Sequence, residues 1–473
     1  MNRLGILLVM VGLFVAMPLS ATAVTYQSSG SAVSPAPMPQ PVYVPLALQD
    51  KQQGESTADA VWAETPSGEA PSGELPTSIT PRSKNLRKSD AETPWTIHQP
   101  SMLKNLGIET YGWIQQGITS NAVNPASRFN GPVACNDRAG EYQLNQFWLG
   151  FKRPTDGTYG LDVGGTLDLV YGTDWRYAYG NGMENRINAM DQLYGLTVAQ
   201  IYGEVAYGDL TVRLGRMAAS LGYEQVPAVA NFFYSHSYSL CYGEPILITG
   251  VVADYQLTDR LVLQGGFHQG WFMWEDVNQH KDFIGGFRWS TEDQSTQFAY
   301  HLTTGDQSGL IGLPTKNWYA HSIVFQQQLT RNARYVLQSN LGYADDLYLS
   351  GHAAQDAEWY SIAQYLFYDI NKKWRAGMRI EWFRDSDGMA VKGLKVLDPQ
   401  FRAWDGIGYS GDFYELTFGL NWRPNSNWVI RPECRWDWYD GPGNGGTPSG
   451  PYPFDDGASK NQFTFAVDAI FTF

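Results

Sequence analysis

The sequence predicts an all-β fold, namely a transmembrane antiparallel β-barrel of about sixteen strands, with short periplasmic turns and long extracellular loops, preceded by a disordered linker. Three observations lead to this fold class. The chain starts with an export signal, no later stretch approaches 18 consecutive apolar residues, and most of the chain consists of strand-length alternating segments. Without a membrane helix, a closed barrel is the arrangement that pairs every backbone group inside a bilayer.

Residues 1–23 have the pattern of a secretory signal peptide. One positive charge at Arg3 precedes an apolar run from Leu4 to Leu19, and Ala21-Thr-Ala23 forms a cleavage site of small residues. A membrane-anchoring helix is the alternative, but the run is interrupted at Gly5, Gly12 and Pro18. We therefore expect export, cleavage after Ala23 and, for a barrel, localisation to the cell outer membrane.

Residues 24–100 are expected to form a disordered periplasmic linker rich in proline and serine. Five prolines fall between Pro35 and Pro45, and no periodic pattern is sustained. A wall-binding arm is the alternative, and a plain linker is favoured over it. The barrel is expected to occupy residues 101–473.

Composition supports strands rather than helices. The chain has 17 Trp, 28 Tyr, 22 Phe and 49 Gly among 473 residues, which suits aromatic girdles and turns. The 33 basic residues are outnumbered by 47 acidic ones, whereas nucleic-acid binding calls for a basic stripe. We therefore expect no nucleic-acid partner.

Sixteen segments of strand length alternate polar and apolar residues. Each is long enough to cross a bilayer as a tilted strand, which takes about 9 to 11 residues. The predicted strands are 107–118, 142–153, 159–170, 198–207, 210–218, 245–256, 260–271, 281–290, 295–304, 317–329, 333–343, 357–369, 372–384, 411–422, 428–438 and 461–473. Strands 107–118 and 357–369 mix polar and apolar residues on both faces, so no inward face is assigned to them.

Short and long connections take turns along these segments. The short ones are ordinary hairpin turns, such as Gly208-Asp209 and Pro154-Thr-Asp-Gly157. The eight long ones centre on 119–141, 171–197, 219–244, 272–280, 305–316, 344–356, 385–410 and 439–460. A barrel with both chain ends on the periplasmic side predicts this sorting, and a soluble sandwich does not.

Charged residues on the predicted strands are expected to point inward. Strand 428–438 places Ile430 and Trp436 on one face and Arg431 and Arg435 on the other. An arginine facing lipid at the bilayer midplane costs roughly 2 to 4 kcal/mol. The candidate pore-lining residues are Asp162, Asp168, Glu204, Arg213, Arg375, Arg379, Arg431 and Arg435.

About sixteen strands leave an aqueous channel, whereas eight make an interior that side chains fill. The acidic candidates lie on early strands, and Arg375, Arg379, Arg431 and Arg435 lie on late ones. On opposite walls of a narrow channel, such groups would set up a field across the pore. The alternative is that they pair along neighbouring strands and stabilise the wall.

Connection 219–244 is a candidate constriction loop because it is too aromatic to extend into solvent. Either it caps the barrel by packing, or it folds inside and narrows the pore, and an ordered surface loop is the third possibility. Its candidate residues are Tyr223, Glu224, Asn231, Phe232, Phe233, Tyr234 and Glu244.

Three cysteines permit at most one internal bridge in an exported chain. Cys135 and Cys241 both fall in long connections, while Cys434 lies on the apolar face of a strand. A Cys135–Cys241 disulfide is therefore a candidate.

Several motifs resemble one family of outer-membrane proteins. They are Tyr111-Gly112-Trp113, Leu214-Gly215-Arg216, Leu221-Gly222-Tyr223-Glu224, Asn231-Phe232-Phe233-Tyr234-Ser235, Glu244-Pro245 and Thr249-Gly250-Val251. With them the chain resembles the "putative beta-barrel porin-2 (OmpL-like)" family from about Leu106 to Phe473. The resemblance implies a porin-like barrel and supplies no catalytic residue.

The expected function is a passive outer-membrane pore for small hydrophilic solutes. A structural or adhesive barrel that acts through its extracellular loops is the alternative. No catalytic motif such as G-x-S-x-G occurs, so no enzyme activity, cofactor or metal site is expected. Expected partners are outer-membrane lipid, small solutes and other copies of the chain as a trimer. The aromatic Phe473 also resembles terminal residues read by the barrel-assembly machinery.

Overall fold

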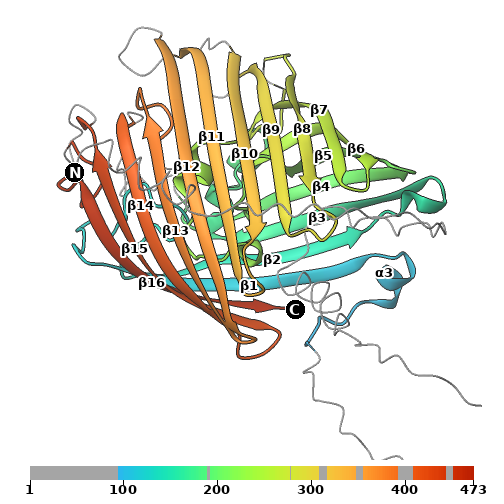
Figure 1. Ribbon diagram of the computed structural model, residues 1–473, viewed down its shortest axis with the longest axis horizontal. Coiled ribbons are helices and arrows are strands. Elements are labelled where there is room, and N and C mark those ends of the chain that lie inside the picture. The colour runs from blue at the N-terminus through green and yellow to red at the C-terminus, as the bar shows by residue number, and fades with distance from the viewer. Residues whose placement is uncertain are drawn as a thin grey trace, which may run out of the picture. The chain divides into compact units, whose positions relative to one another are not determined.

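Sixteen strands close into one antiparallel barrel within the residues that the structure describes (Figure 1). The computed structural model describes residues 94–188, 192–276, 278–307, 317–347, 355–391, 408–443 and 451–473. Each strand pairs with its neighbours in sequence, and β1 pairs with β16. The strands are β1 (Glu109–Asn121), β2 (Tyr142–Arg153), β3 (Asp162–Gly172), β4 (Gly195–Tyr207), β5 (Leu210–Ala218), β6 (Leu247–Thr258), β7 (Leu261–Trp271), β8 (Asp282–Ser290), β9 (Thr296–Asp306), β10 (Asn317–Gln328), β11 (Ala333–Leu347), β12 (Gln355–Asn371), β13 (Trp374–Asp385), β14 (Gly411–Trp422), β15 (Trp428–Asp440) and β16 (Asn461–Thr472).

The helices of the described residues are all short. They are α3 (Ser101–Asn105), α4 (Glu184–Ile187), α5 (Tyr238–Tyr242), η1 (Gly157–Tyr159), η2 (Thr173–Arg176) and η3 (Ala228–Ala230). In this part of the chain no helix has the length and apolar character to span a membrane. Helix α3 precedes β1, within the region assigned to the barrel by sequence.

The predicted fold class is confirmed, because each of the sixteen predicted segments coincides with one strand. The largest difference in bounds is at β11, which continues past residue 343 to Leu347, while β12 begins earlier than predicted, at Gln355. Both strands therefore extend into the sixth long connection, which shortens from the predicted 344–356 to 348–354. The other long connections keep their places.

The outer face of the barrel is apolar and carries aromatic residues near both ends of its strands. On β13, Trp374 and Trp382 lie about 26 Å apart along the strand at the usual rise per residue. Near the short turns Trp374 stacks on Trp422, with ring centroids 5.7 Å apart, and near the long loops Tyr414 stacks on Trp438 at 5.1 Å. Two such girdles flank an apolar band of roughly 25 Å in outer-membrane barrels.

The barrel closes where the first and last strands meet, blue beside red in Figure 1. The Phe473 N–H donates to the Gly112 carbonyl at 2.9 Å, and the Gly112 N–H donates to the Phe473 carbonyl at 3.0 Å. A Cβ on Gly112 would lie 2.5 Å from the Phe473 ring, so glycine allows this close approach. The pairing leaves no free sheet edge in the barrel.

A segment of the predicted linker lies against this seam. The Trp95 N–H donates to Asn427 Oδ1 at 2.8 Å, and Asn427 Nδ2 donates to the Trp95 carbonyl at 2.7 Å. The Trp95 ring stacks on Phe471 at 5.7 Å and meets the edge of Phe473 at 6.3 Å. The predicted signal peptide, 1–23, and linker residues 24–93 lie outside the described residues.

Asn427→Ala is expected to destabilise the barrel more than Trp95→Ala. Asn427 makes three side-chain hydrogen bonds, the third from Nδ2 to the Thr472 carbonyl, together worth about 3 kcal/mol. The Trp95 ring contributes about 1 to 2 kcal/mol through its aromatic contacts. Urea unfolding in detergent measures both losses, and Tyr159→Ala, whose side chain is 94% exposed, is the unaffected control. Equal losses in all three variants would contradict the anchoring role.

Candidate functional site: the barrel interior

The connection between β5 and β6, residues 219–246 and called here the β5–β6 loop, lies inside the barrel. Its residues contact side chains on the inner, buried faces of the strands. Near its end, Glu244 Oε2 accepts hydrogen bonds from Gln338 at 3.0 Å and Asn340 at 2.9 Å, both on β11. In its middle, the Val226 carbonyl accepts from Gln146 on β2 at 2.8 Å. The loop therefore runs between walls that are far apart around the barrel.

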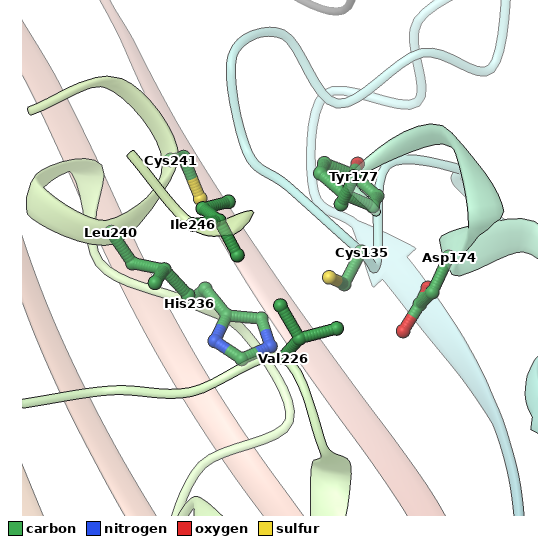
Figure 2. A pocket seen from close by; sticks show the side chains of 8 residues that line it. All are labelled: Cys135, Asp174, Tyr177, Val226, His236, Leu240, Cys241 and Ile246. Atoms are coloured by element: carbon green, nitrogen blue, oxygen red, sulfur yellow. The ribbon is translucent and has the colours of Figure 1, made fainter. Parts of the chain in front are cut away.

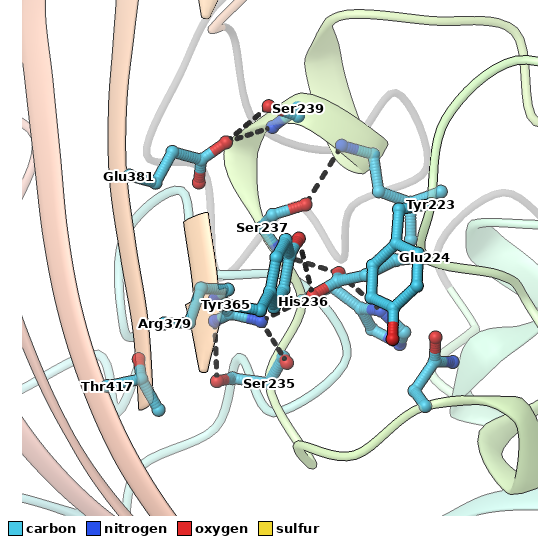
Figure 3. Close-up of polar contacts among 12 residues, drawn as sticks. Tyr223, Glu224, Ser235, His236, Ser237, Ser239, Tyr365, Arg379, Glu381 and Thr417 are labelled. Carbon is cyan, nitrogen blue, oxygen red and sulfur yellow. Dashed lines mark hydrogen bonds and ion pairs between the residues drawn. The ribbon is translucent and has the colours of Figure 1, made fainter. Parts of the chain in front are cut away.

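Arg379 on β13 joins this loop to the barrel wall. Its guanidinium bonds Glu224 of the loop at 2.7 Å and also pairs with Glu415 on β14. The same guanidinium donates to the Ser235 carbonyl at 2.9 Å, and Tyr365 donates to Glu224 at 3.2 Å (Figure 3). Arg379 and Glu415 are fully buried, so this cluster anchors the loop in a dry environment.

Two wall carboxylates hold the loop by its backbone. Glu433 on β15 accepts from the Tyr234 N–H at 2.8 Å and from the Ser235 N–H at 3.1 Å. Glu381 on β13 accepts from the Tyr238 N–H at 2.6 Å. It also accepts from the Ser239 N–H at 2.7 Å (Figure 3). Four main-chain donors thus bind two buried carboxylates, and charge-assisted bonds of this kind are the stronger ones.

Two further late-strand arginines, Arg431 and Arg435, bind loop carbonyls in the same way. Arg431 pairs with Asp468 at 2.5 Å and donates to the Asn231 carbonyl at 2.8 Å. Arg435 pairs with Asp437 at 2.7 Å and donates to the His236 carbonyl at 2.6 Å. Both arginines are at most 2% exposed. Arg431 thus pairs with a residue of the neighbouring strand and Arg435 with a residue of its own strand, and a role of Arg379, Arg431 and Arg435 in lining a pore stays a prediction.

Aromatic side chains of the loop fill spaces that small wall residues leave. A Cβ on Gly377 would lie 2.4 Å from Phe232, and one on Gly419 would lie 3.1 Å from Phe233. The guanidinium carbon of Arg379 also lies over the Phe233 ring, 5.1 Å from the ring centroid. Glycine at both wall positions therefore admits the two rings.

Tyr223 and Tyr234 extend the loop's contacts to opposite sides of the barrel. The Tyr223 N–H donates to Gln338 on β11 at 3.0 Å. The Tyr234 hydroxyl donates to Asn145 on β2 at 2.8 Å. Among the predicted loop residues, Asn231 bonds within the loop, to the Gln225 and Pro227 carbonyls.

The structure divides the other predicted residues of the barrel wall into buried and half-buried groups. Asp168 is 1% exposed and accepts hydrogen bonds from Tyr111 at 2.7 Å and Gln200 at 2.7 Å. Asp162 pairs with Arg153 at 3.0 Å near a short turn. Glu204, Arg213 and Arg375 are half-buried. Arg213 pairs with Asp254, and Arg375 pairs with Asp369. A role in lining a pore stays a prediction for all of them.

The list of candidate residues missed the carboxylates that complete the clusters, Glu415 and Asp468 above all. The signal was available for Glu415: Tyr414, Leu416 and Phe418 form the apolar face of β14, so Glu415 faces inward by alternation. Its pairing with Arg379 depends on the register of β13 with β14, which the sequence alone does not give.

Cys135 and Cys241 line one pocket with Asp174, Tyr177, Val226, His236, Leu240 and Ile246 (Figure 2). Cys135 comes from the connection between β1 and β2, and Cys241 from helix α5. All three cysteines of the chain are free thiols in the structure. The Cys135–Cys241 disulfide is thus not formed here and stays a prediction.

The two glutamates of the loop have opposite electrostatic environments. Burial raises the pKa of Glu244 well above its ordinary value, and the carboxylates of Glu224 and Glu381 add to the rise. Burial opposes ionisation of Glu224 as well, but the Arg379 guanidinium and the His236 and Ser237 donors bring its pKa below its ordinary value. Glu244 therefore stays protonated at pH values at which Glu224 is ionised.

Glu244→Gln is expected to stabilise the protein relative to wild type as pH rises above about 4.5. Folded Glu244 keeps a proton that the unfolded chain releases in this window, so wild-type stability falls with pH there, by up to about 1.4 kcal/mol per unit. Glu224→Gln should differ from wild type in pH slope only below about 4.5, because the pKa of Glu224 is lowered. Urea unfolding at pH 5 and pH 8 measures this, and equal differences between variant and wild type at both values would contradict it.

Comparison with known proteins agrees with this architecture. The family model described as "Putative beta-barrel porin-2, OmpL-like" matches residues 107–473. No curated protein matches the chain at a significant level. Among solved structures, the outer membrane channel DcaP of Acinetobacter baumannii is similar, with 11% identity, a TM-score of 0.50, and 77% of this chain and 97% of that chain covered. Pseudomonas putida OprB (14% identity, TM-score 0.49, coverage 79% and 96%) and the anion-selective porin from Comamonas acidovorans (9%, 0.49, coverage 77% and 99%) are also similar.

At 11% identity the DcaP structure supports the fold alone, whereas the family match extends over the whole barrel. The strand order, the apolar outer face and the loop folded into the interior fit that match. The chain therefore belongs to the "Putative beta-barrel porin-2, OmpL-like" family and is a porin of the outer membrane.

Proposed function

We propose that the barrel conducts small hydrophilic solutes passively and that the β5–β6 loop sets the width of the passage. The observation that carries the proposal is the unequal exposure of inward-facing charged side chains. Under the loop, Arg379 is fully buried, while Arg213 and Arg288 on the opposite part of the wall are 20% and 23% exposed. Water thus reaches a polar part of the interior wall that the loop leaves uncovered.

Planar-bilayer recording tests this function. We expect discrete conductance steps, and liposome swelling in small neutral sugars whose rate falls steeply with sugar size. A folded, inserted protein without conductance would overturn the proposal and favour a structural or adhesive barrel. No residue of the described interior is proposed as catalytic.

We further infer that outer-membrane lipid and the barrel-assembly machinery are partners of the chain, and that several copies assemble into a trimer. One similar solved structure, OmpT of Vibrio cholerae, is described as a trimer form. Sedimentation of the detergent-solubilised protein distinguishes a trimer from a monomer. Normal insertion after deletion of Phe473 would contradict a role for this residue in assembly.

A further inference from the structure

The wall beside the loop carries an excess of half-buried arginines. Arg213 on β5, Arg288 on β8 and Arg334 on β11 face inward, in the halves of these strands next to the short turns. Their side chains retain contact with solvent, in contrast to Arg379, Arg431 and Arg435 beneath the loop. Solutes in the passage therefore meet this first set of arginines and not the second.

A single carboxylate serves two of the three arginines. Asp254 on β6 pairs with Arg213 and, at 2.9 Å, with Arg288. Its side chain is 2% exposed, so the arginines cover it on the side of the lumen. Gln264 also donates to Asp254, at 2.9 Å. The cluster carries two positive charges for one negative charge, and the positive groups are the accessible ones.

The third arginine has neutral neighbours. Arg334 donates to the Tyr223 hydroxyl at 3.3 Å and lies 5.2 Å from the centroid of the Phe367 ring. Within the described residues it forms no ion pair with a carboxylate. Between Arg288 and Arg334 the wall presents amides, with Gln326 donating to Gln297 at 3.3 Å. From β5 to β11 this part of the wall therefore has a net positive charge.

The other half-buried charges in the lower part of the barrel include carboxylates as well as cations. Lys152 is opposite Glu109 in the β1–β2 register, and Arg375 pairs with Asp369. Glu204 is close to Lys152 and lies opposite Arg213 in the β4–β5 register. With Asp254 and Glu204 both counted, Arg213, Arg288 and Arg334 leave one positive charge in excess on this wall.

We propose that the channel prefers anions, small carboxylates in particular, and that Arg213, Arg288 and Arg334 set this preference. The inference rests on the proposed channel function and names its solute class. A positive wall in a narrow lumen bounded by lipid focuses the field and raises the local concentration of anions. Guanidinium groups also present paired N–H donors that match the two oxygens of a carboxylate.

Reversal potentials in a tenfold KCl gradient test the proposal. We expect wild type to favour chloride over potassium, and the triple variant R213Q/R288Q/R334Q to lose at least three-fold in that permeability ratio. Asp254→Asn removes the negative charge and should raise the ratio, which gives a second test of opposite sign. Arg384→Gln, on the outer face of β13, is the matched control and should leave the ratio unchanged.

Each outcome separates the two proposals. Absence of conductance in inserted wild type would overturn the channel function itself. Conductance with a ratio at or below one, or an unchanged ratio in both the triple variant and Asp254→Asn, would overturn the anion preference alone. If the triple variant fails to insert, the permeability ratio of Asp254→Asn decides the test on its own. Potassium succinate in place of KCl extends the test, since carboxylate passage should fall in parallel with chloride passage in the triple variant.

Discussion

Replacing residues 225–239 with a short Gly-Ser linker is expected to raise single-channel conductance several-fold and to shift selectivity toward cations. The segment fills the interior between β2 and β15, where it contacts Asn145, Gln146 and Glu433. Its removal widens the passage without touching a strand, and the strands close the barrel by backbone pairing.

The change in selectivity follows from the wall that the replacement uncovers. That wall carries three arginines and five carboxylates, namely Arg379, Arg431, Arg435, Glu381, Glu415, Glu433, Asp437 and Asp468. Once hydrated, the acidic groups outnumber the basic ones and attract cations. Bilayer recording with a salt gradient measures both effects, and a Gly-Ser replacement of the exposed turn 291–295 is the control. Unchanged conductance in the loop variant would mean that the loop does not limit the passage.

Arg379→Gln is expected to destabilise the folded protein by about 3 to 5 kcal/mol, because it removes the guanidinium that pairs with the buried carboxylates of Glu224 and Glu415. Loss of the anchor should also make the channel noisy, as the Ser235 region detaches from the wall. Urea unfolding in detergent gives the first quantity and the variance of the open-channel current gives the second.

Two further variants separate charge pairing from packing. Arg384→Gln removes an arginine from the same strand, but its pair with Asp412 is on the outer face and 35% of its side chain is exposed, so a loss below about 1 kcal/mol is expected. The double variant R379Q/E415Q should recover part of the stability lost in Arg379→Gln, since one stranded carboxylate is gone. A loss in Arg384→Gln equal to that in Arg379→Gln would argue against burial as the cause.

The strands were predictable because lipid imposes one rule on all of them, an apolar outer face at every second residue. The rule was weakest where inward residues are also aromatic. On β12, Trp359, Tyr365 and Phe367 are buried against the interior, so both faces are apolar. On β1 the buried inner face carries Trp113 beside Gln115 and Thr119, so it mixes apolar and polar residues. These are the two segments with mixed faces.

The interior was predictable only one residue at a time. Alternation placed Arg379, Arg431 and Arg435 inward. It did not identify the partners of Arg379 and Arg431, because these ion pairs join residues 36 and 37 positions apart, Arg379 with Glu415 and Arg431 with Asp468. The aromatic content of connection 219–244 predicted that it packs against the barrel and does not extend into solvent. Its path depends on contacts with β2, β11, β13 and β15, which only the closed barrel brings together.

The backbone anchoring of the β5–β6 loop has a consequence for how such a chain diverges. Glu433 and Glu381 bind main-chain N–H groups, which every residue but proline supplies. Residues of the strands therefore position the loop largely independently of the loop's own side chains. Loop side chains that face the passage are then free to drift while the loop itself stays in place. Related barrels can therefore acquire new solute preferences by substitutions in the loop, while the same wall carboxylates keep the loop backbone in place.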